Sequence, residues 1–209
     1  IGENWLPLLL NLESSNQHAL DLAGTILDYL YKVKLSEEKI GDYDRREANF
    51  DFDCHYAKEI AKKVAKLAGK KLGVRALDVF NAQLVRTVTY QNNDDFSSIW
   101  RPSIEKHSQN QHHDDANSIL VLAYREALAG YVEENPEDAY QFVSSMLESG
   151  YQIIARIAIH TIDKYFISLG NLSDVLLDSK YLQSDYRYEM WHFLRQRYQR
   201  LQDNQRSTI

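Results

Sequence analysis

The chain has 209 residues, of which 44% are hydrophobic and 26% are charged. These proportions are ordinary for a globular protein and the length is enough to bury a core, so they exclude a largely disordered chain. No apolar run approaches the roughly 20 residues that cross a bilayer, which predicts a water-soluble protein with no membrane partner. The formal net charge of -6 repels polyphosphate, so nucleic acid is not the expected partner unless a local basic patch binds it.

The single cysteine and the first residues of the chain bear on its origin. Cys54 cannot form a disulfide within the chain and no secretory signal opens the sequence, so a cytoplasmic location is expected. The chain begins with Ile1 rather than methionine, and the apolar stretch Trp5–Leu12 has no earlier element to pack against. We therefore expect residues 1–209 to form a single helical-repeat domain that is a fragment of a larger protein.

The first half of the chain predicts amphipathic helices. With only 8 glycines and 3 prolines, and with apolar residues at helical spacing, the sequence gives strands little support. A first helix is expected over Gln17–Lys34, and a second begins at His55 and ends near Gly69–Gly73. A third carries its apolar stripe from Leu77 to Val88. The short turn at Gly73 should fold the second and third helices antiparallel.

The second half repeats this arrangement. Asp114 or Asp115 can cap the start of a helix, and Asn135 and Pro136 end that helix and begin the next one. The remaining helices are expected over about residues 137–149, 151–169 and 185–202. The sequence therefore predicts consecutive helices that are joined by minimal turns.

The spacing of the helices indicates a repeat architecture. Helix starts recur at intervals of roughly 40 residues in the first half, which is the period of HEAT and armadillo repeats. We predict an all-α fold, specifically an α-solenoid-like array of antiparallel helical hairpins. Because the units show no residue-level similarity, an irregular helical bundle is the alternative. The polar stretches Ser36–Asp53 and Asn92–His113 are predicted to be long irregular loops.

Histidines and carboxylates are densest between His107 and Asp115. Imidazole nitrogens and carboxylate oxygens ligate zinc or iron, so His107, His112, His113, Asp114 and Asp115 could form the centre of a metal-dependent hydrolase. Glutamine and asparagine interrupt this cluster, and its spacing matches no helical i, i+4 ligand pair. The sequence therefore favours a structural role for the cluster, with no metal or other cofactor.

The dyad His113-Asp114 resembles that of the His-Asp metal phosphohydrolases, and His55 and Asp163 could take the outer ligand positions. In that family the dyad lies within an apolar helix, whereas here it lies in a polar run at a helix start. The sequence also lacks a glycine-rich phosphate loop and a nucleophile elbow. We therefore predict no catalytic residues, and the metal-dependent hydrolase is kept as the enzyme alternative.

Arginines and aromatic residues alternate along the last predicted helix. Arg195 and Arg197, beside Trp191 and Tyr198, could pair with phosphates and stack on bases, which makes an RNA-binding domain a second alternative. The aromatic residues also suit a packed stripe with the arginines on the solvated side. This second interpretation is the one that we favour.

One segment is unusual for a plain helical repeat. It is Ser98–Glu105, together with His107, Gln109 and Asn110 after it. Three later stretches fit the same pattern: Ile119–Val121, Arg125–Leu128 and Ala155–Ala158. These stretches resemble helical regions of large bacterial proteins that also carry a STAND-type nucleotide-hydrolysing module, several of them linked to anti-phage defence. The resemblance covers about a third of the chain and gives none of these residues a chemical role. It implies a helical array that recognises a target and thereby favours an active oligomer.

The same segment supplies the residues that we expect to contact a partner. Trp100 is a large apolar anchor, and Arg101 and Glu105 have the i, i+4 spacing of an ion pair. The segment is interpreted first as a packing device that pins a long loop onto the helical array; in the alternative it is a recognition surface, and these three residues with His107 are the ones predicted to contact the partner. We predict a non-catalytic scaffold or sensor region that binds a partner protein or another domain of its parent chain.

Overall fold

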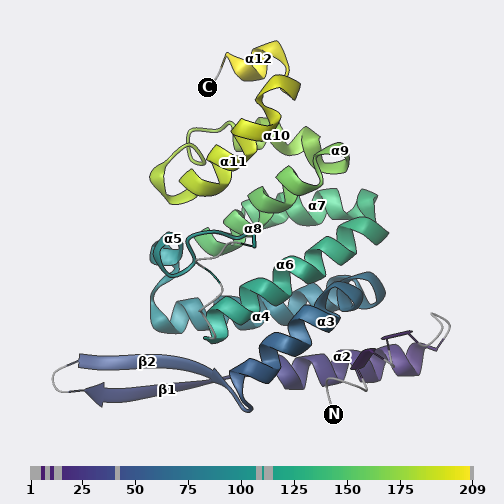
Figure 1. Ribbon diagram of the computed structural model, residues 1–209, viewed down its shortest axis with the longest axis vertical. Coiled ribbons are helices and arrows are strands. Elements are labelled where there is room, and N and C mark those ends of the chain that lie inside the picture. The colour runs from purple at the N-terminus through teal and green to yellow at the C-terminus, as the bar shows by residue number, and fades with distance from the viewer. Residues whose placement is uncertain are drawn as a thin grey trace. The chain divides into compact units, whose positions relative to one another are not determined.

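The computed structural model describes residues 6–7, 10–11, 16–40, 43–106, 110 and 115–207. The fold is mostly helical, as predicted, with a small two-stranded hairpin (Figure 1). The chain divides into two compact units, one formed by Ile1–Asn93 and Gln111–Glu134 and the other by Asp94–Asn110 and Asn135–Ile209. We call them unit 1 and unit 2, and the expected single domain over residues 1–209 stays a prediction.

The described part of unit 1 contains long helices and the hairpin. In chain order its elements are α2 (Gln17–Tyr31), β1 (Val33–Ile40), β2 (Tyr43–Phe50), α3 (Cys54–Leu72), α4 (Val74–Gln91) and α6 (Ala116–Glu134). The helices confirm those predicted from apolar spacing. Helix α2 ends before the predicted Lys34, because the backbone becomes extended at Lys32 and the chain pairs as strand β1 from Val33.

Helix α6 is the buried centre of unit 1. Its buried residues lie on every side of the helix, and its most extensive neighbour is α3. The two helices meet at two glycines. A β-carbon on Gly69 would lie 1.8 Å from the Ala127 carbonyl oxygen, and one on Gly130 would lie 2.0 Å from the Lys66 carbonyl oxygen. Glycine, which has no β-carbon, is what allows the two backbones to approach this closely.

The turn between α3 and α4 consists of Gly73. This residue has a φ of 56°, in the left-handed region that favours glycine, and its N–H donates to the Gly69 carbonyl oxygen at 3.1 Å. The predicted short turn is therefore confirmed. The helix on which α3 mainly packs was not predicted. It is α6, which is distant in the chain, rather than α4, which follows α3 directly.

Strands β1 and β2 occupy most of Ser36–Asp53, so the prediction of an irregular loop there is wrong. The strands are antiparallel, with Val33 opposite Phe50 and Glu37 opposite Arg46. Val33 and Phe50 are buried at the base, and the ribbon extends past the helices of unit 1 (Figure 1). Opposite charges that face each other across the strands stabilise the pairing. Because these strands contain few apolar residues, the alternation that predicts a strand is missing.

Unit 2 consists of shorter elements. In chain order its described elements are η1 (Asp94–Phe96), α5 (Ser97–Trp100), α7 (Pro136–Leu147), α8 (Gln152–Lys164), α9 (Phe166–Leu169), η3 (Gly170–Leu172), α10 (Ser173–Leu176), η4 (Ser184–Tyr186), α11 (Arg187–Arg197), η5 (Tyr198–Arg200) and α12 (Asp203–Arg206). Among the described residues of both units, no helix is long and apolar enough to cross a membrane.

The helices of unit 2 follow the predicted order but not all of the predicted bounds. Pro136 is the first residue of α7, as predicted, and α7 packs on α8, which packs on α11. The helix predicted to reach Leu169 ends at Lys164, because the backbone leaves the helical conformation at Tyr165. The last long helix covers only Arg187–Arg197, since the turns on either side of it are 3-10 helical.

The segment Asn92–His113, predicted to be irregular, is partly ordered into short elements. Elements η1 and α5 occupy its first third, and an irregular stretch follows from Arg101 to Lys106. Of the residues after Lys106, only Asn110 belongs to the described part of this segment. The prediction of a loop therefore holds for Arg101–Lys106 and is wrong for the two elements before it.

Candidate functional site

The most deeply buried charges in the described part of unit 2 form an ion pair between α8 and α11. The side chains of Arg156 and Glu189 are 0% and 3% exposed. Arg156 Nε and Nη2 donate to the two carboxylate oxygens of Glu189 at 3.0 and 2.8 Å. This bidentate geometry matches guanidinium to carboxylate and offsets part of the cost of removing both charges from water.

The same ion pair holds the irregular segment that follows α5. The Ile104 N–H donates to Glu189 Oε1 at 3.2 Å, and Arg156 Nη2 also donates to the Pro102 carbonyl oxygen at 3.4 Å. Arg101 is itself buried, and its Nε donates to a carbonyl oxygen of the same segment at 3.0 Å. The backbone of this segment is therefore fixed against α8 and α11 by buried charges.

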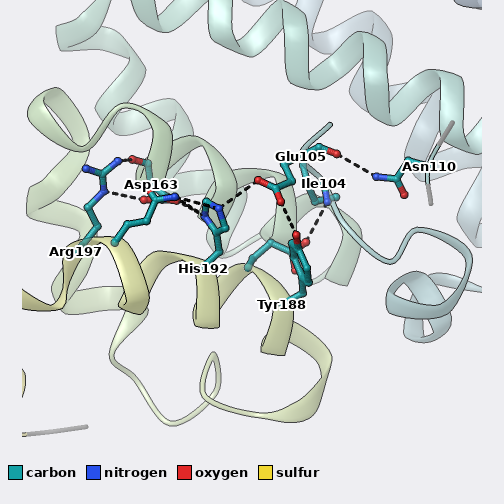
Figure 2. Close-up of polar contacts among 9 residues, drawn as sticks. Ile104, Glu105, Asn110, Asp163, Tyr188, His192 and Arg197 are labelled. Carbon is teal, nitrogen blue, oxygen red and sulfur yellow. Dashed lines mark hydrogen bonds and ion pairs between the residues drawn. The ribbon is translucent and has the colours of Figure 1, made fainter. Parts of the chain in front are cut away.

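A chain of polar side chains runs beside this ion pair (Figure 2). Arg197 Nε donates to Asp163 Oδ1 at 2.7 Å, and Asp163 Oδ2 lies 2.7 Å from His192 Nδ1. His192 Nε2 lies 3.3 Å from Glu105 Oε2, and the other oxygen of Glu105 accepts a hydrogen bond from the Tyr188 hydroxyl. We call these five residues the polar chain. It ties α8, α11 and the irregular segment together.

Both imidazole nitrogens of His192 are engaged within the polar chain. Nδ1 faces Asp163, while Nε2 lies 3.3 Å from Glu105 and 3.0 Å from Gln196 Nε2. A general base must reach the proton of a substrate, but the cavity beside His192 measures only about 10 Å³. Burial and the bond to Glu105 raise the pKa of Tyr188, so its hydroxyl stays a donor. This arrangement favours a role for His192 and Tyr188 in holding neighbouring segments in position rather than in acid–base catalysis.

Asp94 fixes the start of α8. Its two carboxylate oxygens accept hydrogen bonds from the N–H groups of Gln152 and Ile153, at 2.6 and 3.0 Å, which are donors that a helix N-terminus leaves without partners inside the helix. Burial raises the pKa of Asp94, although these two bonds act in the opposite direction. Because Asp94 belongs to η1, the hydrogen bonds hold the η1–α5 segment against α8.

A cavity of about 450 Å³ opens beside the buried ion pair. Its lining is formed by Ser98, Pro102, Arg156, Ser184, Asp185, Arg187, Tyr188, Glu189 and Trp191. Trp191 is 52% exposed, and Phe96 and Ile99, which flank Ser98 in the chain, are 57% and 72% exposed. The volume falls within the range of about 300–1,000 Å³ that is common for ligand sites. An exposed aromatic side chain in the lining of a cavity is a common feature of interaction sites.

Three of the four residues predicted to contact a partner belong to the described part of the chain, and none of these three lines the cavity. Trp100 is half-buried at the end of α5, Arg101 is buried, and Glu105 belongs to the polar chain. His107 lies outside the described residues. The cavity instead uses Pro102, one residue after Arg101. Contact of the four predicted residues with a partner stays a prediction.

Four members of the predicted metal cluster lie outside the described residues: His107, His112, His113 and Asp114. The fifth, Asp115, accepts hydrogen bonds from the N–H and the hydroxyl of Ser118 at 2.9 and 3.0 Å. It therefore caps α6, as predicted. Within the described parts of the chain, no group of three or more histidine, cysteine, aspartate or glutamate residues could hold a metal ion.

The residues considered for a phosphohydrolase centre and for RNA binding have structural contacts. His55 and Asp163, the candidate outer ligands of the phosphohydrolase centre, belong to different units, and Asp163 is part of the polar chain. Of the arginines considered for RNA binding, Arg197 is held by Asp163, and the guanidinium of Arg195 lies 5.0 Å from the ring centre of Trp191. Asp163 and the two arginines therefore each have a contact within the chain that involves neither a metal nor RNA.

The centre of the site, the pair of Arg156 and Glu189, was not predicted, and Arg156 appears in the sequence analysis only within the stretch Ala155–Ala158 that carries the resemblance. Arg156 carried a signal, because it interrupts the apolar run Ile153–Ile159, and a charge on an apolar face requires a buried partner. Glu189 carried none, because it lies among the charged and aromatic residues of a polar helix. The pair is separated by 33 positions, which local spacing cannot connect.

The chain was compared with family models, with curated proteins and with solved structures, and none of these matches it. The resemblance to helical regions of STAND-type proteins therefore stays a prediction. What remains for an argument about function is the geometry of unit 2 itself: a buried ion pair, the polar chain and a cavity whose lining includes the exposed Trp191.

Proposed function

We propose that this chain is a non-catalytic binding module that recognises a partner protein through the cavity of unit 2. The observation that carries the proposal is the exposure of Trp191 in the lining of a cavity of about 450 Å³. Trp191, Tyr188 and Arg187 all belong to the lining of that cavity, and tryptophan, tyrosine and arginine contribute most of the binding energy at protein interfaces.

The walls of the cavity support this proposal because several of them are held in place by hydrogen bonds. The Tyr188 hydroxyl is bonded to Glu105, and the Pro102 carbonyl oxygen accepts from Arg156. A wall that is already fixed loses little conformational entropy when a partner binds. The polar chain and the ion pair thus act as the support of a preformed binding surface.

The partner in this proposal is another protein or another domain of a larger bacterial cytoplasmic protein. The helices would then belong to an α-solenoid-like array, and the resemblance to STAND-type proteins implies that target binding favours an active oligomer. Nucleotide hydrolysis would take place in another part of the parent chain. A role in anti-phage defence rests on the sequence resemblance alone.

A pull-down with matched variants tests the proposal. The immobilised chain is compared with Trp191→Ala, which removes the exposed aromatic wall, and with Ile167→Ala. Ile167 is 97% exposed in the same unit but does not line this cavity, so its loss controls for general surface effects. Truncation of an interface hot spot costs about 2 kcal/mol or more, so the partner bound by the wild type should be lost with Trp191→Ala and kept with Ile167→Ala.

Two outcomes would count against partner binding through this cavity. One is equal retention of the partner by wild type and Trp191→Ala. The other is retention of single-stranded RNA that falls steeply with salt and requires Arg195, which is the behaviour expected of an RNA-binding domain. Loss of binding in both Trp191→Ala and Ile167→Ala would be a general surface effect and would also count against a contact specific to this cavity.

A further inference from the structure

We infer that the cavity of unit 2 takes an uncharged, extended peptide segment whose main-chain carbonyl oxygen accepts a hydrogen bond from Arg156 Nη1. The inference rests on the proposed function and names the part of the partner that enters the cavity. It combines three features of the lining: a buried donor without an acceptor, balanced formal charges, and apolar walls.

The donor is the amino nitrogen of Arg156 that the ion pair does not use. Nε and Nη2 donate to Glu189, but the buried Nη1 has no hydrogen-bond partner among the described residues. A buried charged donor without an acceptor is costly, and an occupant that supplies an oxygen atom removes that cost. Arg156 belongs to the lining of the cavity, so an occupant of the cavity is the acceptor that we propose for Nη1.

The charges of the lining favour a neutral acceptor over an anion. Arg156 is already paired with Glu189, and the lining holds one further cation, Arg187, and one further carboxylate, Asp185. Formal charges therefore cancel, and burial next to Glu189 penalises a second carboxylate or a phosphate. A carbonyl oxygen supplies the acceptor without adding a charge.

The walls indicate an extended chain with an apolar side chain. Trp191 and Tyr188, three positions apart on α11, lie on the same side of the helix and form the aromatic wall, with Pro102 also in the lining. Extended polyproline-type segments dock on aromatic grooves of this kind, and their carbonyl groups make no internal hydrogen bonds. A helical segment would offer carbonyls that are already paired.

Access to Nη1 requires a small rearrangement of the lining. Arg156 is 0% exposed, so side chains of the lining must move before an occupant reaches it. Arg187 is a long, exposed side chain in the same lining, and rotamer changes of this kind are common when proteins bind partners.

Nuclear magnetic resonance of the whole chain, labelled with 15N, tests the inference. The probe is a pentapeptide with a central leucine between two pairs of prolines, acetylated at its N-terminus and amidated at its C-terminus. The expected result is a shift of the Trp191 indole and the Arg156 side-chain resonances on titration. A matched peptide with glutamate in place of leucine, and inorganic phosphate, should bind at least five-fold more weakly.

Variants separate the donor from the aromatic wall. Trp191→Ala should weaken peptide binding at least ten-fold, and Ile167→Ala should leave it unchanged. Arg156→Lys keeps a positive charge beside Glu189 but removes Nη1, and should weaken binding at least five-fold. If Arg156→Lys fails to fold, as judged by circular dichroism, the Arg156 resonances of the unaltered chain decide the question.

The inference is overturned if the peptide does not bind, if the glutamate peptide or phosphate binds more tightly, or if Trp191 responds while the Arg156 resonances stay unchanged. Failure of the inference differs from failure of the proposed function. A partner protein that requires Trp191, with no response to the peptide, removes only the inference. A peptide that binds as expected, with a partner that does not require Trp191, removes the proposed function instead.

Discussion

Replacing Gly69 by alanine tests the crossing of α3 and α6. In an exposed helix this change stabilises by about 1 kcal/mol, because alanine is the better helix former. At the crossing, the new β-carbon would lie 1.8 Å from the Ala127 carbonyl oxygen, although ordinary contact begins at 3.4 Å. The obstacle is backbone and cannot rotate away, so the helices must separate. Overpacking of this severity costs about 3 kcal/mol, so we expect a net loss of about 2 kcal/mol.

Gly24→Ala is the matched control, because Gly24 is also helical. A β-carbon there would lie 2.4 Å from the guanidinium of Arg75, whose side chain is 45% exposed and can turn aside. Only the weak surface pair with Asp21 is at risk, so we expect a neutral or slightly stabilising effect. Urea unfolding followed by far-ultraviolet circular dichroism measures both variants. If Gly69→Ala unfolds at the same urea concentration as the wild type, the close contact of α3 and α6 is refuted.

Two further predictions concern buried groups of unit 2. Glu189→Gln leaves the charge of Arg156 buried without its counter-charge and should cost about 3–5 kcal/mol in urea unfolding. The control is Asp203→Asn, which breaks the surface pair with Arg206, in which Asp203 is 96% exposed, and should cost less than about 1 kcal/mol. Similar losses of stability in Glu189→Gln and Asp203→Asn would contradict the special role of the buried pair. Burial raises the pKa of Tyr186 to about 12, so the folded chain keeps a proton that an unfolded tyrosine loses near pH 10. Stability should therefore fall as pH rises from about 10 to 12, and an identical alkaline unfolding profile for Tyr186→Phe would contradict this.

The parts of the fold that follow from local chemistry were predictable. Asp115 caps α6, Pro136 begins α7, and Gly73 makes the turn after α3, each for a reason that operates within a few residues. The hairpin was not predictable by the same means. Its strands place opposite charges across from each other, such as Glu37 opposite Arg46, and these residues can be recognised as neighbours only when the register of the strands is known.

The candidate site was less predictable than the fold, because all of its defining contacts join distant segments. The polar chain brings Glu105 against His192, and the ion pair brings Arg156 against Glu189. The sequence indicated that the stretch around Trp100 was unusual. In the structure, Ser98 and Pro102, which lie on either side of Trp100 in the chain, line the cavity. Which neighbours of that stretch face the cavity depends on the packing of α5, α8 and α11, which spacing along the chain does not determine.

A double variant separates what the buried ion pair contributes to stability from what it contributes to recognition. Combining Arg156→Met with Glu189→Gln removes both charges, while the glutamine carbonyl can still accept from the Ile104 N–H. Neutral replacement of buried ion pairs is often tolerated, so the double variant should recover most of the stability lost in Glu189→Gln alone, to within about 1–2 kcal/mol of the wild type. The affinity of the double variant for the peptide should be lower than that of the wild type, because Nη1 of Arg156 is absent. A double variant that folds and still binds the peptide as tightly as the wild type would mean that the pair has no part in recognition.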